Sequence, residues 1–180
     1  MSALSKQDIE RLLKLLNKEL RSVSVNGEVY LVGGAVMCLA LGARESTRDL
    51  DGYFEPTKKI REAVARVAVE AGVDENWLND GVKGYLSERG SFAKYLEMSN
   101  LKVFCADANY LFAMKCLATR IGEEFQDLDD IRYLLRHIGL RKYEDALEAI
   151  TKYYPLGRFP QKTLYALEEL LENSDSNRSQ

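Results

Sequence analysis

The sequence predicts an α+β fold: a small mixed β-sheet in the first half of the chain and a helical second half. Short runs with alternating or continuous apolar residues come first, at 28–32, 48–54, 92–98 and 101–106. From Ala108 onward, apolar residues recur at helical spacing instead. Strands followed by a run of helices are typical of an α+β domain, here with about four strands. The hydrophobic content of 46% over 180 residues is enough for a buried core.

Three helices are predicted among these strands. The first, Lys6–Arg21, has an apolar face of isoleucine and leucine. The second, Ala35–Leu41, is short, apolar and rich in small residues, and we expect it to end at Gly42. The third follows the strand that Pro56 ends; Thr57 is its expected N-cap and Gly72 its end. Residues 77–81 predict a turn that opens into a short helix, and Ser99-Asn100 predicts the turn of an antiparallel pair.

The expected organisation is a core of residues 1–107 with its N-terminal helix, a helical part of residues 108–172 packed on that core, and a frayed tail of residues 173–180. The helical part contains four apolar stripes, which begin near Leu111, Leu128, Tyr143 and Leu164.

Composition excludes some classes of function. The formal charge of −3 gives no support for nonspecific nucleic-acid binding, although a local basic patch remains open. Charged residues interrupt the first 20 positions, and no later run is long enough to span a bilayer, so we expect neither a signal peptide nor a membrane partner. Cys38, Cys105 and Cys116 stand singly in apolar stretches and predict buried thiols of a cytoplasmic protein.

A glycine pair and an acid pair are the most informative motif. Gly33-Gly34 follows the first strand, and Asp49 and Asp51 lie in the next one. Strand residues two apart face the same side, so the two carboxylates are expected side by side, where they repel without a cation between them. Magnesium is bound through one or two carboxylates together with substrate phosphates, and glycines let backbone amides approach an anion. We therefore expect chemistry on a nucleoside triphosphate.

With these residues the chain resembles the nucleotidyltransferase superfold, whose signature is a Gly-Gly or Gly-Ser turn, a short helix, and Asp-x-Asp on the next strand. More narrowly, the run from Gly33 through Arg44, Thr47, Asp49 and Asp51 is similar to bacterial nucleotidyltransferase-like proteins related to abortive-infection (AbiEii-type) toxins. A second block strengthens the resemblance, which covers about residues 28 to 136: a helix carrying a lysine, followed by an acid-rich helix start, formed by Tyr110–Lys115, Ala118, Arg120, Asp127 and Asp130.

The resemblance implies a role for each matching residue. Gly33 and Gly34 would hold the triphosphate, and Asp49 and Asp51 would bind one or two magnesium ions and take part in catalysis. Lys115 would also be catalytic, and would contact phosphate or steady the acids. Nucleotide contacts are also expected from Arg44, Thr47 and Arg120. The implied reaction is displacement at the α-phosphorus with release of pyrophosphate.

The chain departs from the pattern at the third carboxylate, which active members usually carry on a neighbouring strand. The strand at 101–106 contains no acid, so the candidates are Asp107 at its end and Asp80 in the turn before it, with Asp80 taken as a metal ligand. Other interpretations stay open as well. The glycine pair fits an ordinary strand-to-helix turn, Arg44 fits an ordinary surface charge, and Asp127 and its neighbours fit helix capping.

The function expected from these features is transfer of a nucleoside monophosphate from a triphosphate to an acceptor, which the sequence leaves open among RNA, protein and small molecule. Two alternatives retain the fold without this activity: a noncatalytic triphosphate-binding module, and a toxin–antitoxin component that acts with a partner protein.

Overall fold

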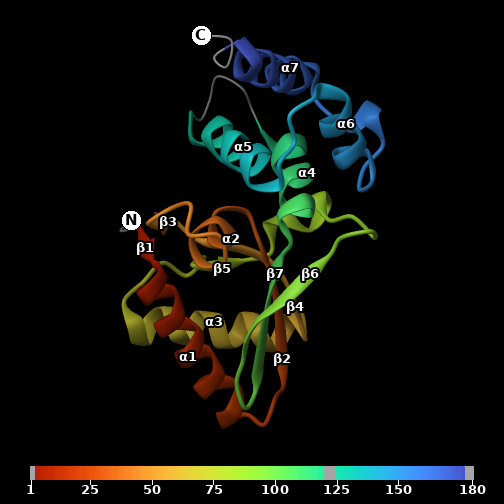
Figure 1. Ribbon diagram of the computed structural model, residues 1–180. Coiled ribbons are helices and arrows are strands. Elements are labelled where there is room, and N and C mark those ends of the chain that lie inside the picture. The colour runs from red at the N-terminus through yellow and green to blue at the C-terminus, as the bar shows by residue number, and fades with distance from the viewer. Residues whose placement is uncertain (1–2, 120–124, 177–180) are drawn as a thin grey trace. The chain divides into compact units, whose positions relative to one another are not determined.

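The computed structural model describes residues 3–119 and 125–176. The chain forms two compact units (Figure 1). Unit 1 comprises Met1–Gly84 and Phe92–Ala106, and unit 2 comprises Tyr85–Ser91 and Asp107–Gln180. The predicted α+β class is confirmed, because a mixed sheet forms in the first half and helices follow it. No helix within the described residues is long and apolar enough to cross a membrane.

Unit 1 contains a five-stranded sheet with the strand order β5-β4-β2-β7-β6, one strand more than expected, and a two-stranded sheet of β1 and β3. β2 pairs antiparallel with β4 and parallel with β7, and β6 and β7 form the predicted hairpin. In chain order its elements are β1 (Leu4–Ser5), α1 (Lys6–Ser22), β2 (Gly27–Val32), α2 (Gly33–Leu39), β3 (Ser46–Thr47), β4 (Leu50–Glu55), α3 (Thr57–Ala71), β5 (Leu78–Asn79), the 3₁₀ helix η1 (Gly81–Tyr85), β6 (Phe92–Glu97) and β7 (Leu101–Ala106).

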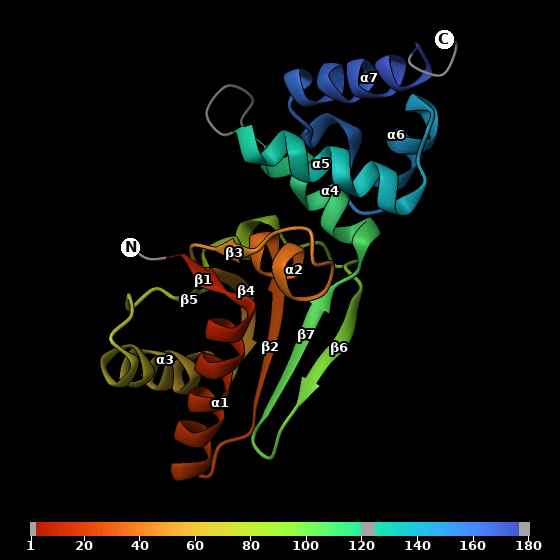
Figure 2. The ribbon, with the colours of Figure 1, turned by 60° about the vertical axis from the view of Figure 1, so that its left-hand side comes forward.

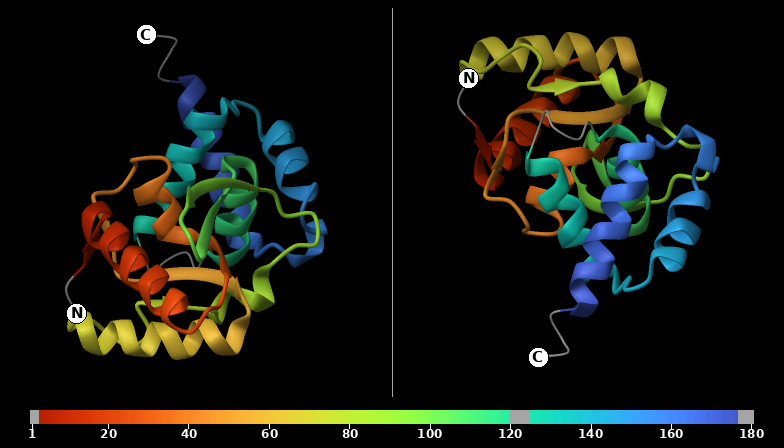
Figure 3. Two further views of the ribbon diagram at one scale, coloured as in Figure 1. Left: turned by 90° about the horizontal axis from the view of Figure 1, so that it is seen from below. Right: turned by 90° about the horizontal axis from the view of Figure 1, so that it is seen from above.

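The core of unit 1 lies between the sheet and two helices. Figures 2 and 3 show α1 and α3 side by side along one face of the sheet. Alternate strand residues such as Leu31, Phe54 and Val103 are buried on this face, and a Cβ on Gly27, which shares it, would meet Leu20 of α1 and Ile60 of α3. The residues directly before and after these on each strand point to the opposite face of the sheet. This alternation determines on which face each polar strand residue lies.

Unit 2 is helical and consists of α4 (Ala108–Ala118), α5 (Phe125–Ile138), α6 (Tyr143–Thr151), the 3₁₀ helix η2 (Leu156–Arg158) and α7 (Gln161–Ser176), together with the segment 85–91. Two tyrosines hold that segment. The hydroxyl of Tyr110 accepts a 2.9 Å hydrogen bond from the Ser87 amide, and the Tyr154 hydroxyl donates to the Tyr85 carbonyl oxygen at 2.5 Å. The predicted boundary at residue 107 placed residues 85–91 in the core, whereas they belong to unit 2.

Four local expectations are wrong in detail. Thr57 is the first residue of α3 and not its cap: its hydroxyl donates to the Phe54 carbonyl oxygen at 3.1 Å, and Pro56 occupies the N-cap position. Helix α2 begins at Gly33 and ends at Leu39, two residues earlier than predicted at each end. The turn predicted at residues 77–81 is replaced by the short strand β5, since the Trp77 carbonyl oxygen accepts from the Leu50 amide at 2.8 Å, whereas the short helix expected after it forms as η1. β4 starts at Leu50, so Asp49 precedes the strand.

Candidate functional site

The glycine pair forms the sharp connection between β2 and α2. Gly33 has a φ of 64°, in the left-handed region that residues with a Cβ rarely adopt. A Cβ placed on Gly34 would meet the Thr47 hydroxyl at 2.7 Å and the Arg44 guanidinium at 3.3 Å. Glycine at position 34 therefore allows two predicted nucleotide contacts, Arg44 and Thr47, to reach the backbone of this turn.

The acid pair lies at the same place. Val32, the residue before the turn, is in register with Asp51 of the antiparallel strand β4. A Cβ on Gly33 would lie 3.4 Å from the Asp51 Oδ2 atom, so this carboxylate stands directly against the turn. Thr47 also fixes the approach to β4, since its hydroxyl donates to the Asp49 carbonyl oxygen at 3.2 Å.

Asp49 is electrostatically strained at this position. Its pKa is raised above the ordinary value, first because the side chain is partly removed from water and next because of the charge of Asp51. Asp74 acts in the same direction, while Arg48 and the amide of Asn79 oppose the increase. The contribution of Asp51 is the repulsion expected between two carboxylates that lie close together.

Six predicted site residues of unit 1 are thus together in space: Gly33, Gly34, Arg44, Thr47, Asp49 and Asp51. They come from the start of α2, from β3 and β4, and from the connections before these two strands. The two carboxylates are hard oxygen donors of the kind that magnesium prefers, and magnesium is usually bound through one or two carboxylates together with waters and substrate phosphates. Among the described residues, no group of three or more His, Cys, Asp or Glu side chains is arranged to hold a metal ion.

Neither candidate for the third carboxylate joins this group. The Asp80 carboxylate binds Arg61 and Lys83, both at 2.6 Å, and these contacts hold its pKa below the ordinary value. Asp107 caps α4, where its side chain accepts from the Tyr110 amide at 2.9 Å. Both acids therefore have structural partners of their own.

The acid pair lies at the start of β4, whose neighbours in the sheet are β5 and β2. β7, the strand where a third acid was sought and not found, is separated from β4 by β2. In β5, Asn79 is in register with Asp51, and its Nδ2 atom donates to Asp49 Oδ2 at 3.3 Å. Sequence reasoning missed Asn79 because a two-residue strand shows no periodicity. The available signal is Asn79-Asp80-Gly81 itself, which by its sequence predicts a turn that opens into a short helix.

Lys115 lies in unit 2, on α4. Its Nζ atom is 3.0 Å from Asp127 Oδ1 and 2.8 Å from Asp130 Oδ2, both on α5. All three side chains are largely buried, with exposed fractions of 13%, 20% and 5%. Asp127 does lie in the first turn of α5, as capping would require, but it also neutralises the lysine. Arg120 lies outside the described residues.

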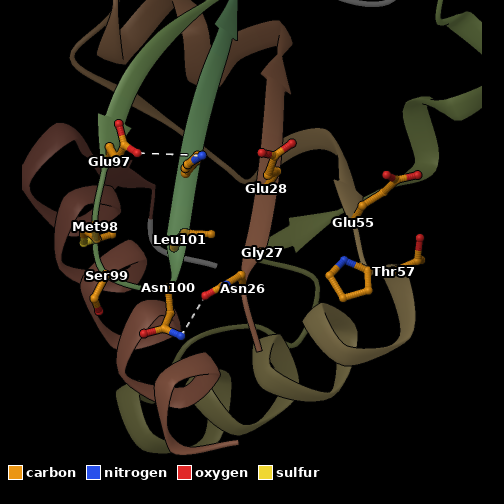
Figure 4. A pocket seen from close by; sticks show the side chains of 12 residues that line it. Asn26, Gly27, Glu28, Glu55, Thr57, Glu97, Met98, Ser99, Asn100 and Leu101 are labelled. Atoms are coloured by element: carbon orange, nitrogen blue, oxygen red, sulfur yellow. Dashed lines mark hydrogen bonds and ion pairs between the residues drawn. The ribbon is translucent and has the colours of Figure 1, made fainter. Parts of the chain in front are cut away.

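A groove occupies the opposite end of the strands. Its volume is about 690 Å³, and it lies where β2 and β7 begin and β4 ends, with Glu28, Glu55 and Asn100 among its lining residues (Figure 4). None of the predicted site residues lines it. The groove is therefore separate from the site formed by the glycine pair and the acid pair.

Three comparisons with known proteins were made with this chain. No family model matches it, and neither a curated protein nor a solved structure is significantly similar to it.

Proposed function

We propose that this protein is a magnesium-dependent nucleotidyltransferase-like enzyme, which transfers a nucleoside monophosphate from a nucleoside triphosphate to an acceptor: RNA, a protein or a small molecule. The observation that carries the proposal is the position of Asp51, whose carboxylate stands against the left-handed Gly33 with no side chain between them. A phosphate at the turn would lie beside the two carboxylates. Because phosphate and carboxylates repel each other, that arrangement favours a divalent cation as the third partner.

Each residue then has a defined task. Gly33 and Gly34 keep side chains away from the triphosphate, and the Arg44 guanidinium supplies positive charge beside Gly34. Asp49 and Asp51 would hold magnesium, which when bound neutralises the phosphate charge and the leaving group. Burial and, after it, the charge of Asp51 raise the pKa of Asp49, and a bound cation would relieve the repulsion between the two acids.

The test measures transfer and binding separately. Protein is incubated with each of the four α-labelled triphosphates, magnesium and a pool of candidate acceptors, and labelled acceptor is separated from free nucleotide. We expect transfer by the parent chain and a loss of at least a hundredfold in Asp49→Ala and Asp51→Ala, because each removes half of the charge that holds the ion. Glu55→Gln is the matched control, since Glu55 lies on the same strand and face as Asp51 and accepts from the Tyr53 hydroxyl.

Equal transfer by Asp51→Ala and the parent would contradict the proposal. So would the absence of any magnesium-dependent triphosphate binding in calorimetry.

The second candidate is a noncatalytic triphosphate-binding module, and the neutral Asn79 beside the acid pair favours it. Tight magnesium-dependent binding without turnover would select this function, whereas measurable turnover would exclude it. A toxin–antitoxin component is a further form of the same alternative. It requires a second chain that co-purifies with this protein and changes its triphosphate binding.

A further inference from the structure

The corner of the site beside β4 is closed by β5, a strand of two residues. The two strands are parallel, with Leu78 opposite Leu50 and Asn79 opposite Asp51. Both leucines are buried against the core. Because residues in register point to the same face of a sheet, Asn79 and Asp51 share the other face. Asn79 thus occupies the position next to the acid pair where a third acid would complete a three-carboxylate site.

The amide of Asn79 is held in one orientation. Its Oδ1 atom accepts from the Gly81 amide at 3.1 Å, and its Nδ2 atom donates to Asp49 Oδ2 at 3.3 Å. A backbone amide can only donate, so the Gly81 contact fixes which end of the side chain is oxygen. The donor end must therefore face Asp49.

We propose that Asn79 is the positioning residue of the acid pair and that it limits the site to a single divalent ion. This inference rests on the proposed function. The amide donates to one oxygen of Asp49 and so leaves the other free for the ion. It also keeps a third negative charge out of a site where Asp49 and Asp51 already repel each other.

Two substitutions separate these effects. Asn79→Ala removes the hydrogen bond to Asp49 and leaves the charge of the site unchanged. Asn79→Asp removes the same donor and adds a third carboxylate to the corner. If Asn79 served stability alone, both substitutions would weaken ion binding. If it positions the acid pair, Asn79→Ala weakens ion binding, whereas Asn79→Asp adds a binding site for a second ion. Asn76→Ala is the matched control, because Asn76 is exposed in the preceding loop and only its backbone amide bonds to Asp74.

The experiment counts bound Mn²⁺ by the loss of the free-ion electron paramagnetic resonance signal, with and without a nonhydrolysable triphosphate. We expect one ion in the parent chain and in Asn76→Ala. Asn79→Ala should bind one ion about tenfold more weakly, the usual loss when a hydrogen bond to a ligating carboxylate is removed. Asn79→Asp should bind a second ion. Circular dichroism melting confirms that each variant is folded.

Each other outcome overturns the inference. Two ions in the parent chain, or equal affinity in Asn79→Ala and the parent, would show that Asn79 does not set the site, while the proposed function would stand. No Mn²⁺ bound by the parent, with or without the triphosphate, would overturn both the inference and the proposed function.

Discussion

At the scale of single residues, two glycines share a backbone conformation and differ in their surroundings. Gly33 and Gly42 have φ values of 64° and 61°. A Cβ on Gly42 would meet nothing within 4 Å, whereas one on Gly33 would lie against the Asp51 carboxylate. Comparing substitutions at Gly33 and Gly42 therefore separates the loss of stability caused by the left-handed conformation from the effect of a methyl group beside Asp51.

Alanine at either glycine should lower the free energy of unfolding by a similar amount, about 1 kcal/mol, because both replacements force a Cβ into the left-handed region. Only Gly33→Ala should also weaken magnesium-dependent triphosphate binding, since its methyl group would stand between Asp51 and the turn. Denaturant unfolding and calorimetry measure the two effects. Equal binding by the two variants would show that the turn does not face the nucleotide.

The charge of Asp49 has a predictable effect on stability. Its pKa is higher in the folded protein than in the unfolded chain, so folding disfavours the ionised form. Asp49→Asn should therefore stabilise the protein at pH 7 in the absence of metal, by about 0.5 to 1 kcal/mol, the size of typical stabilising substitutions.

The advantage of Asp49→Asn should shrink as pH falls through the raised pKa toward the ordinary value of 3.8, because the parent carboxyl then becomes neutral as well. Thermal melting of both proteins from pH 7 to pH 4 measures the difference, with Glu55→Gln as the charge-matched control. A difference that grows toward low pH would contradict the assignment.

At the scale of elements, helices α4 and α5 are joined by a charge cluster. Lys115 bridges Asp127 and Asp130, and Asp130 is nearly fully buried. A buried pair adds little relative to apolar residues of the same volume, but removing one partner leaves charge without compensation. The cluster therefore fixes how the two helices face each other more than it raises stability.

Lys115→Met keeps most of the apolar stem and removes the positive charge that Asp127 and Asp130 share. We expect a loss of about 3 kcal/mol in the free energy of unfolding at pH 7. The control is Asp129→Ala, which breaks an exposed ion pair with Arg132 and should cost less than about 1 kcal/mol. Comparable losses in the two variants would mean that the cluster is not buried in solution.

At the scale of the whole molecule, both units enclose a cysteine-containing core. Cys38 and Cys105 are buried in unit 1, and Cys116 is fully buried in unit 2. Burial raises the pKa of all three thiols, to about 12 for Cys105. Because the thiolate is the reactive form, the native protein should resist thiol reagents.

Reaction with Ellman's reagent at pH 8 should be at least a hundredfold slower in the native protein than in guanidinium, where all three thiols should react. Cys38→Ala, Cys105→Ala and Cys116→Ala assign each thiol, and thermal melting shows that the variants remain folded. Rapid modification of any one cysteine in the native state would show that its unit opens or is packed differently.

Sequence patterns predicted most of the regular structure. Helix α1 matches the expected range within one residue, because its five buried apolar residues recur on one face. Gly72 ends α3 as predicted, with a φ of 67° that suits glycine. The two-residue strands β1, β3 and β5 were not predicted, since pairing with a neighbour and not side-chain periodicity creates them.

The sequence by itself determined that a diglycine turn follows one strand and that two acids come at the next, because local spacing fixes which residues follow each strand. Tertiary structure alone decided what surrounds them. β5, and not β7, pairs with β4, and this pairing places Asn79 beside Asp49. Asp80 instead forms an ion pair with Lys83, and Asp107 caps α4. Strand order depends on which apolar faces pack together over the whole sheet, and no short stretch of sequence contains that information.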